Sequence, residues 1–527
     1  MATRKIIGVI GAGPMAIYLL KHLIGSELPL RICIYEQHTL AGTGMPYRQE
    51  ISPDYMLANI FSREIPQIQE PLADWLRTQP DGWLDRWGLA HDAISARAFY
   101  PRSLLGAYLV SQLQALVVAG IAAGHDIEVR TNHEVVDIKP MEKLISVLAK
   151  TPHEWLTDTF DTVVLTTGHT WDAHPKVAGA SLVSPWPASN IAALAAGAIG
   201  ILGSSLSAVD VAVALAHIHG SFTKTDRGLN WKAHPGSEAM TITMVSKTGI
   251  LPEADFYYPY PYDPLVHLTD TAVEGFVADG AGQILARTFD LLIKELKNCD
   301  PAYLDELGMG NPTVEAFGGA YFARRQRLGA FRALQANLVE SRATIAREQT
   351  IAWRYALLRG HEVFEAALAH VTQDEWQTFR THLLPVFADC YAAVPHLSLD
   401  RLEAMRAANV LEIAEVGDDA EFLAAPDGGV IVRNQAADQH FTSMVDARGQ
   451  ASALPSDLPF PTLVKALENA ADPVQSPFRL ALRSGLQDGI YCLSMPQVLV
   501  RYPFSQGLPN CDALSVIVAA EILTMSG

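Results

Sequence analysis

The stretch Lys5–Glu36, KIIGVIGAGPMAIYLLKHLIGSELPLRICIYE, decides the fold. It opens with the β-branched run Lys5–Ile10, which is typical of a strand buried on both faces. A glycine-rich turn and the apolar, helix-periodic stretch Ile17–Leu23 follow, and a second β-rich run, Leu30–Tyr35, ends at Glu36. A strand, a glycine turn, a helix and a strand, with an acid about 20 residues past the turn, predict a Rossmann-like dinucleotide-binding unit.

Each part of this turn has a physical task in binding a dinucleotide. Gly11 allows the tight turn, Gly13 lets the backbone approach a pyrophosphate, and Ala16 lets the helix pack close to the sheet. The helix N-terminus offers free N–H groups and the positive end of a dipole. Glu36 can accept hydrogen bonds from both hydroxyls of an adenosine ribose. The cofactor-binding residues predicted here are Gly11, Gly13, Pro14, Met15, Ala16, Glu36 and Gln37.

A second glycine-rich loop, Ala41–Tyr47 (AGTGMPY), follows the acid. In flavin enzymes this region passes close to the pyrophosphate and the ring, and Met56–Asn59 is predicted to continue the same wall. The alternative is an ordinary surface loop. On the flavin interpretation the cofactor is FAD, and Gly44, Met45 and Asn59 contact it.

A degenerate second fingerprint lies further along the chain. The β-rich run Ala198–Leu202 leads into Gly203–Ala208, where serine replaces the second glycine of the pattern. A later strand, Met240–Val245, ends in Ser246 and Lys247, and a cation there suits a ribose 2′-phosphate, which favours NADPH over NADH. The alternative is a structural turn. The residues predicted to bind the pyridine nucleotide are Gly203, Ser204, Ser205, Ser207 and Lys247.

The composition describes a large folded protein. Of its 527 residues, 49% are hydrophobic and 18% charged, and the net charge of −18 argues against binding the phosphate backbone of nucleic acids. The five cysteines contain no CxxC pair, which disfavours a disulfide framework, a dithiol centre and a structural metal site. GxSxG and HExxH motifs are absent, which disfavours hydrolases. The apolar runs are too short to cross a membrane, so a soluble cytoplasmic protein is expected.

The order of elements predicts an α/β flavoprotein with two Rossmann-like dinucleotide-binding domains and a mainly helical insertion. Residues 1–190 are expected to form the first part of the FAD domain, and residues 191–260 the NAD(P) segment. Residues 261–425 lose the β/α alternation, and amphipathic stretches such as Ala320–Leu338 predict a helical substrate or cap region. Residues 426–527 are expected to return to the FAD domain and to end in a helix.

One basic cluster stands out in this acidic chain. Residues 321–360 contain eight arginines but only two acids, Glu340 and Glu348. Such a segment is either a helical face paired with acids elsewhere, or a site that grips a carboxylate substrate or the NADP phosphate. The second interpretation favours a small anionic amine as substrate. The residues predicted to bind it are Arg324, Arg325, Arg354 and Arg359.

Motifs spread over nearly the whole chain resemble those of the YdhS-like family of bacterial FAD/NAD(P)-binding proteins. They are GAGPMA at 11–16, AGTGMPY at 41–47, MLANI at 56–60, GSSLSAVD at 203–210, SKTGILPEADF at 246–256, WRYALLRGHE at 353–362 and DARGQ at 446–450. The resemblance implies the two-domain flavoprotein fold and both cofactors.

More distantly, the layout is similar to flavin-containing and N-hydroxylating monooxygenases, including aspartate N-monooxygenases. That likeness implies that Arg102 begins a helix beside the FAD and that Val135 flanks the adenine. It also implies that Thr167 and Gly168 pass near the FAD. The FxGxxxHxxx[YF] fingerprint of flavin-containing monooxygenases is absent. The predicted cofactor-binding set is completed by Asp446, Gln506 and Gly507.

These inferences predict an FAD-dependent oxidoreductase that uses NADPH, with NADH as the open alternative. By the resemblance, it is a monooxygenase that uses molecular oxygen to hydroxylate the nitrogen of a small anionic amine, such as an acidic amino acid. The alternatives are an NAD(P)H-dependent flavin oxidoreductase without oxygen insertion and a non-catalytic flavin redox sensor. No catalytic acid or base is assigned, and neither nucleic acid nor a membrane is expected as a partner.

Overall fold

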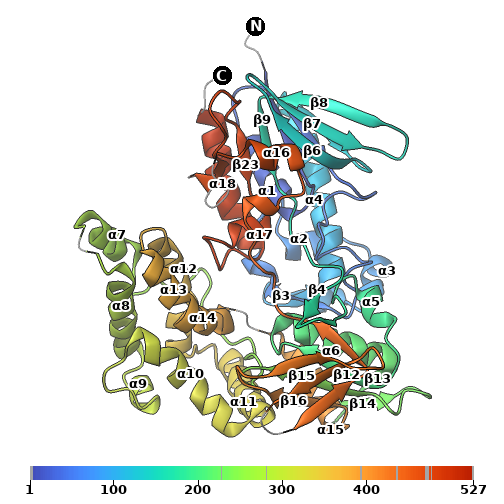
Figure 1. The fold of residues 1–527 in the computed structure, drawn as a ribbon, viewed down its shortest axis with the longest axis vertical. Coiled ribbons are helices and arrows are strands. Elements are labelled where there is room, and N and C mark those ends of the chain that lie inside the picture. The colour runs from blue at the N-terminus through green and yellow to red at the C-terminus, as the bar shows by residue number, and fades with distance from the viewer. Residues whose placement is uncertain are drawn as a thin grey trace. The chain divides into compact units, whose positions relative to one another are not determined.

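The computed structural model describes residues 4–226, 228–280, 282–391, 394–434, 437–468, 474–475 and 478–524. The chain forms two compact units (Figure 1). Unit 1 consists of Met1–Trp171 and Gln450–Gly527, and unit 2 consists of Asp172–Gly449. Unit 2 is therefore an insertion in the chain of unit 1.

Unit 1 is built on a seven-stranded sheet in the order β21-β22-β23-β9-β1-β2-β5. The strands from β23 to β5 run parallel, and β22 and β21 add an antiparallel edge. The bounds are β1 (Lys5–Ile10), β2 (Leu30–Tyr35), β5 (Asp126–Arg130), β9 (Thr162–Leu165), β21 (Val474–Gln475), β22 (Arg479–Leu480) and β23 (Ile490–Cys492). The predicted N-terminal strand, turn, helix and strand are thus confirmed.

Both faces of this sheet are covered, as its apolar strands require. Ile7 and Val9 of β1 belong to a core shared with the helices of one face, where α1 and α18 lie side by side (Figure 1). Ile10 belongs to the core of the opposite face, under an antiparallel sheet of β6, β7 and β8. The covering elements are α1 (Pro14–Leu23), α4 (Arg102–Ala122), α18 (Leu508–Thr524), β6 (Glu134–Pro140), β7 (Ile145–Lys150), β8 (Trp155–Phe160) and α16 (Pro461–Ala466). Smaller elements are β3 (Leu57–Phe61), β4 (Phe99–Pro101), α2 (Leu72–Arg77), α3 (Asp81–Leu84) and α17 (Met495–Val498).

Helix α4 is, by length and composition, long and apolar enough to cross a membrane, and 50% of its most apolar window is buried. Two of its polar side chains accept hydrogen bonds from other segments of unit 1. Gln112 Oε1 accepts hydrogen bonds from the N–H groups of Gln69 and Glu70. Ser111 accepts one from the Trp75 indole. These contacts are those of a core helix in the α/β layer, and the location of the protein in the cell stays a prediction.

Unit 2 contains a four-stranded parallel sheet in the order β16-β15-β12-β20. Numbered along the chain, its strands have the order 3-2-1-4, the arrangement that opens a Rossmann fold. The bounds are β12 (Ala198–Leu202), β15 (Thr241–Ser246), β16 (Leu411–Glu415) and β20 (Ser443–Asp446). Around it lie α5 (Ala188–Ala192), α6 (Leu206–His219), α15 (His396–Ala407), β10 (Lys176–Val177), β11 (Ala180–Ser181), β13 (Gly220–Thr225), β14 (Gly228–Ala233), β17 (Glu421–Ala424), β18 (Val430–Arg433) and β19 (Asp438–Phe441).

A helical group lies in the chain between β15 and α15. It consists of α7 (Asp270–Ala278), α8 (Ile284–Cys299), α9 (Tyr303–Glu306), α10 (Val314–Leu328), α11 (Ala330–Arg347), α12 (Ala352–Leu368), α13 (Gln373–His382) and α14 (Leu384–Tyr391). The single helix predicted over Ala320–Leu338 is two helices, because Gly329, at φ +79°, ends α10 and precedes α11. A positive φ is accessible to glycine and strained for most other residues.

The chain passes from one unit to the other at positions that differ from the predicted domain boundaries at residues 190 and 426. Because β20 pairs with β12, residues 443–446 complete the sheet of unit 2, and the chain returns to unit 1 at Gln450 rather than at residue 426. The first crossing follows Trp171, well before residue 190, since the Val183 N–H already bonds within unit 2, to Met444 O. The NAD(P) segment and the helical region thus share one compact unit.

Candidate functional site

A cavity of about 720 Å³ opens in unit 1 at the carboxyl ends of β1 and β9. Open α/β sheets bind ligands at this edge, and the volume is in the usual range of ligand pockets. The predicted residues that line the cavity are Gly11, Gly13, Pro14, Met15, Glu36, Gln37, Gly44, Met45, Val135, Thr167, Gly168 and Gly507. The structure thus gathers most of the predicted FAD residues around one space.

The first glycine turn is shaped by close backbone contacts. Gly11 has φ +103°, and a Cβ there would lie 2.5 Å from Thr166 O. A Cβ on Gly13 would lie 3.1 Å from Gly44 Cα. Gly13 is the N-cap of α1 and offers no side-chain cap, so the first N–H groups of this helix are available to an anion at the cavity wall.

The second glycine-rich loop packs directly on the first. Gly42 N–H donates to Ala12 O at 2.8 Å. Gly44 has φ +59°, and a Cβ there would lie 2.8 Å from Pro14 Cδ. The two turns therefore form one continuous glycine-lined wall, as the sequence pattern predicts for a surface that a pyrophosphate approaches.

Glu36 is buried, with 6% of its surface exposed, at the end of β2. Its Oε1 accepts a hydrogen bond from His38 N–H at 2.9 Å, and its Oε2 accepts a longer one from Ala12 N–H at 3.4 Å. Arg48 Nη2 lies 3.8 Å from Oε1 and also lines the cavity, although the sequence analysis did not single it out. The carboxylate is thus fixed beside the first glycine turn, where a ribose of a bound dinucleotide would meet it.

The end of β9 forms the opposite wall. Thr166 Oγ1 donates to Gly11 O at 2.7 Å, which ties this strand end to the first turn. Thr167 Oγ1 donates to Ser494 Oγ at 2.7 Å, and Gly168 O accepts from Met495 N–H at 3.3 Å. These bonds bring the chain after β23 to the cavity. The lining residues from this C-terminal part that sequence reasoning missed are Leu493, Met495, Gln497, Leu508 and Cys511.

Three histidines also line the cavity: His38, His133 and His169. Burial and the neighbouring Arg48 lower the pKa of His38. Burial lowers the pKa of His169, and a hydrogen bond to Gln450 opposes that shift only in part. His38 and His169 are therefore neutral at pH 7 and add no fixed charge to this wall.

Within unit 1, four predicted FAD residues are not among those lining the cavity. Ala16 is buried in α1 at 1% exposure, which is the close helix–sheet packing expected of it. Asn59 lies in β3, and Arg102 begins α4 with its N–H bonded to Met56 O. Gln506 directly precedes Gly507, which does line the cavity.

Thiol chemistry has little support in this cavity. Within the described ranges Cys511 is its one lining cysteine, and burial raises the pKa of that thiol to about 12. A thiol with that pKa is protonated and a poor nucleophile at neutral pH. The described residues also contain no group of three His, Cys, Asp or Glu side chains that could hold a metal ion.

The second glycine turn lies at the carboxyl edge of the unit 2 sheet. Gly203, at φ +121°, directly follows β12, and its N–H donates to Val245 O at 2.8 Å. Ser205 is the N-cap of α6 without a side-chain cap, and Ser204 and Ser207 flank it. The predicted nucleotide residues of this turn therefore surround a helix N-terminus, which is an anion-binding arrangement.

Lys247 and Asp446 lie at the carboxyl ends of the two strands that flank β12. Lys247 follows β15, and its exposed ammonium contacts Asp418 at 2.5 Å. Asp446 ends β20, so it belongs to unit 2 and not to the FAD part of the chain in which the predicted domain boundaries placed it. Its carboxylate pairs with Arg448.

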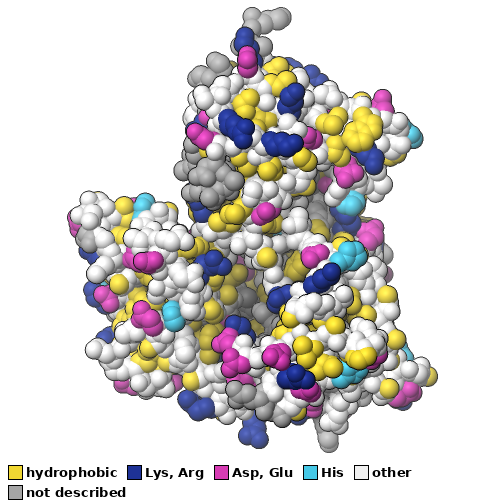
Figure 2. Space-filling view, in the orientation of Figure 1, with side chains coloured by type: hydrophobic (Ala, Val, Ile, Leu, Met, Phe, Trp, Pro, Cys, Tyr) yellow, Lys and Arg dark blue, Asp and Glu magenta, His cyan; other side chains and the backbone are white. Residues whose placement is uncertain are grey.

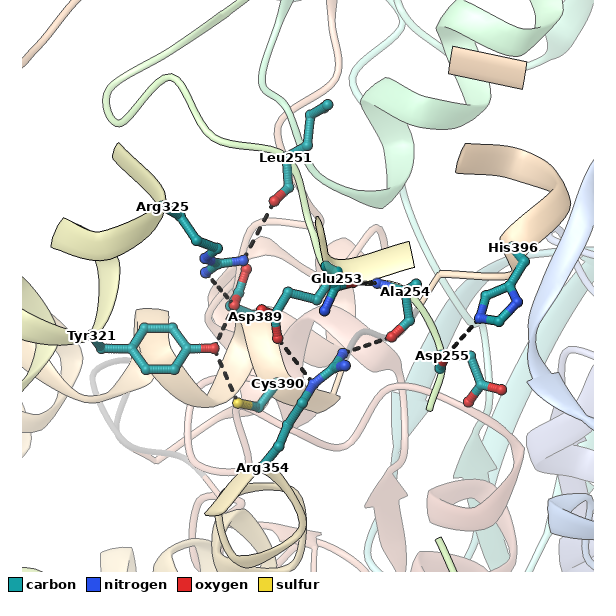
Figure 3. Close-up of polar contacts among 11 residues, drawn as sticks. Leu251, Glu253, Ala254, Asp255, Tyr321, Arg325, Arg354, Asp389, Cys390 and His396 are labelled. Carbon is teal, nitrogen blue, oxygen red and sulfur yellow. Dashed lines mark hydrogen bonds and ion pairs between the residues drawn. The ribbon is translucent and has the colours of Figure 1, made fainter. Parts of the chain in front are cut away.

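All four arginines of residues 321–360 that are predicted to bind substrate have carboxylate partners. Figure 3 shows the ion pair of Arg325 with Asp389, in which Nη2 lies 2.5 Å from Oδ2. It also shows the ion pair of Arg354 with Glu253. There Nε lies 2.9 Å from Oε2, but the two groups are not aligned as a hydrogen bond. Burial disfavours the Glu253 carboxylate, but the charges of Arg354, Arg325 and Arg324 outweigh it and lower its pKa.

The two remaining predicted arginines are also paired. Arg324 lies 3.7 Å from Glu306, and Arg359 pairs with Glu362. Over unit 2, in the lower part of Figure 2, basic and acidic side chains lie interspersed. These pairs support the first of the two interpretations, a helical face whose arginines are paired with acids outside residues 321–360.

Comparisons with known proteins agree with this geometry. The FAD-NAD(P)-binding family matches residues 8–170, and the YdhS-like middle domain matches residues 269–391. The chain is 34% identical over 523 residues to YdhS of Escherichia coli strain K12, covering 98% of this chain and 97% of that protein. It belongs to the YdhS-like family. As a YdhS-like protein it is a flavoprotein that binds FAD and NAD(P).

Solved structures share the fold of this family member. An ornithine N-hydroxylase of Kutzneria sp. 744, in a structure with reduced FAD, NADP⁺ and L-ornithine, superposes with a TM-score of 0.50 at 15% identity and 99% coverage of both chains. The reduced ornithine hydroxylase of Pseudomonas aeruginosa gives a TM-score of 0.49 at 14% identity, again with 99% coverage of both chains. The first likeness confirms the predicted two-domain flavoprotein architecture.

Proposed function

We propose that this YdhS-like protein is an FAD-dependent NAD(P)H oxidoreductase with FAD in the unit 1 cavity. The observation that carries the proposal is the joint wall of Gly13 and Gly44 at the uncapped start of α1, with the buried Glu36 carboxylate beside it. The wall and the helix N-terminus fit a pyrophosphate, and Glu36 fits the adenosine ribose hydroxyls. Thr167 and Gly168, which follow β9 closely in the chain and line the cavity, would also contact the bound FAD.

NAD(P)H is assigned to the carboxyl edge of the unit 2 sheet. Gly203 and the N-terminus of α6 would hold its pyrophosphate, and Lys247 a ribose 2′-phosphate. Asp418 contacts the Lys247 ammonium, and the Lys247 side chain is 76% exposed. This arrangement supports NADPH as the preferred nucleotide.

Among flavin reactions we place the protein with N-hydroxylating monooxygenases of small amines. The bound flavin would supply hydride acceptance from NAD(P)H and reactivity with molecular oxygen. The chain's own contribution is a cavity wall that includes backbone N–H groups and the two neutral histidines His38 and His169. The raised pKa of Cys511 counts against the competing class of disulfide reductases. Because the four arginines are paired, they give no preference for an anionic amine.

The test of the reaction class is aerobic NADPH oxidation with a panel of cationic, neutral and anionic amines. Amine-stimulated NADPH oxidation with little peroxide is the expected result. Peroxide formation independent of every amine would point to a flavin oxidoreductase without oxygen insertion. Bound FAD with no NADPH oxidation at all would point to a redox sensor and would overturn the enzyme assignment.

The FAD assignment is tested separately by Glu36→Gln. Loss of charged acceptors for the ribose hydroxyls should weaken FAD binding by about 1.5–3 kcal/mol, or roughly 10- to 150-fold. Flavin absorbance after dialysis and a titration of apoprotein with FAD measure this effect. Glu142→Gln, at an exposed turn of unit 1, is the control and should bind FAD normally. Equal FAD affinity of the two variants would refute the role of Glu36.

A further inference from the structure

The strand order of unit 2 predicts where a crevice lies at the carboxyl edge of its sheet, and this adds to what the second glycine turn indicates. β12, the first strand, lies between β15 on one side and β20 on the other. The chain leaves β12 toward β15 and β16, and later adds β20 to the opposite side. Dinucleotides bind in the crevice outside the carboxyl ends of the two strands at such a reversal. Here those strands are β12 and β20.

The segment that follows β20 forms one wall of this crevice. Leu202 and Asp446, the last residues of β12 and β20, are in register, and Ala447 N–H donates to Leu202 O at 3.0 Å. A Cβ on Gly203 would lie 2.9 Å from Ala447 O and 3.5 Å from the Arg448 backbone nitrogen. Arg448 therefore starts directly beside the second glycine turn.

The Arg448 guanidinium is held at this position by a two-bond contact. Nε and Nη2 donate to the two oxygens of Asp446 at 2.8 and 2.7 Å, and hydrogen bonding to this carboxylate raises the pKa of Arg448. Arg448 is 53% exposed, whereas Asp446 is 14% exposed. Of the five N–H groups of a guanidinium, these two bonds use two, and a forked, fixed cation is suited to phosphate oxygens.

We propose that Arg448 binds the pyrophosphate of NAD(P)H and that Asp446 is the positioning residue that holds its guanidinium. This inference rests on the proposed function, because it deepens the assignment of NAD(P)H to unit 2. The pyrophosphate is common to NADH and NADPH, whereas the 2′-phosphate assigned to Lys247 belongs to NADPH alone. The two cations therefore make separable contributions to binding.

The experiment measures nucleotide affinity of the FAD-loaded protein by calorimetry, without turnover. The ligands are NADP⁺, NAD⁺ and adenosine 2′-monophosphate, which carries the 2′-phosphate but has no phosphate at the 5′ position. Arg448→Ala should weaken NADP⁺ and NAD⁺ by a similar factor of roughly ten or more and leave binding of the monophosphate unchanged. Lys247→Ala should weaken NADP⁺ and the monophosphate but not NAD⁺. Arg448→Lys keeps the positive charge but loses the forked guanidinium geometry. Its affinities for NADP⁺ and NAD⁺ should lie between those of Arg448→Ala and wild type.

Arg433→Ala is the matched control. Arg433 is 50% exposed, and its Nε and Nη2 likewise donate to the two oxygens of one carboxylate, that of Asp438, but it lies in the β17–β18–β19 sheet. It should bind all three ligands as wild type does. Equal affinities for Arg448→Ala and Arg433→Ala, or a loss of binding of the 2′-monophosphate in Arg448→Ala, would overturn the inference. Wild-type protein that binds neither NADP⁺ nor NAD⁺ would instead overturn the proposed function, and this inference with it.

Discussion

Replacing Arg354 by methionine should destabilise unit 2 strongly. The side chain is fully buried, and its Nε lies 2.9 Å from Glu253 Oε2. Removal of one partner from such a pair leaves an uncompensated charge in the interior, which typically costs about 3–5 kcal/mol. Methionine retains most of the apolar stem, so the loss of packing is small beside the loss of charge.

Two other contacts adjust this magnitude. Arg354 Nη2 donates to Ala254 O at 2.8 Å, and its guanidinium lies 4.3 Å from the centre of the Phe256 ring. Each is worth about 1 kcal/mol. Arg325 reduces the expected loss, because it also lowers the pKa of Glu253 and would partly stabilise the Glu253 carboxylate that Arg354→Met leaves unpaired. We therefore expect a loss of about 4 kcal/mol, or about 8–16 °C in the melting of unit 2.

Calorimetry of the full chain and hydrogen exchange of residues 250–258 measure the effect. Arg342→Met is the control, because its 2.5 Å pair with Asp400 is 47% exposed on the arginine side and should contribute no more than about 1 kcal/mol. The double variant Arg354→Met with Glu253→Gln should regain most of the stability, since no charge is then left unpaired. Similar losses for Arg354→Met and Arg342→Met, or no recovery in the double variant, would refute the reasoning.

Further predictions concern the turns and the histidines. Gly11→Ala should reduce FAD content severely, because its Cβ would lie 2.5 Å from Thr166 O, whereas Gly82→Ala, which meets nothing within 4 Å, should not; flavin absorbance measures both. Lys247→Ala should raise the Michaelis constant for NADPH and leave that for NADH nearly unchanged, as steady-state kinetics will show. Burial lowers the pKa values of His217 and His361 to about 4 in the folded protein. As pH falls from about 6.5 toward 4 the unfolded chain binds protons that the folded chain does not, so the free energy of unfolding should decrease. His361→Asn should flatten that decrease in urea titrations at several pH values.

Local sequence patterns predicted the parts of the site that lie close together in the chain. The turn from Gly11 to Ala16 and the acid Glu36 follow from spacing alone, because a strand, a turn and a helix are each specified by their own residues. The wall formed by Gly13 and Gly44 followed from two glycine-rich stretches a short distance apart. In these cases the residues that lie together in the structure belong to segments that are also close in the sequence.

Contacts between distant segments were not predictable in that way. Met495 lines the cavity because β23 pairs with β9, and no sequence motif near residue 495 indicates that pairing. Glu253 and Asp389 neutralise arginines from outside residues 321–360, so a count of charges within that segment could not decide between a paired face and a substrate site. Arg448 acquires its position from the pairing of β20 with β12, which also moved the expected domain boundary.

The insertion of unit 2 has a consequence for synthesis on the ribosome. β9 needs β23 as its neighbour, yet the chain must first produce all of unit 2 between them. Roughly 320 residues separate the two strands, which at about 5–20 residues per second means a wait of about 15–65 s. During that time one edge of β9 lacks its final neighbour, and α18 has not yet covered α1. An open edge strand and an uncovered apolar helix invite association with other chains. The nascent protein should therefore depend on chaperones until its last fifty or so residues emerge, and C-terminal truncation should yield aggregates rather than a smaller soluble flavoprotein.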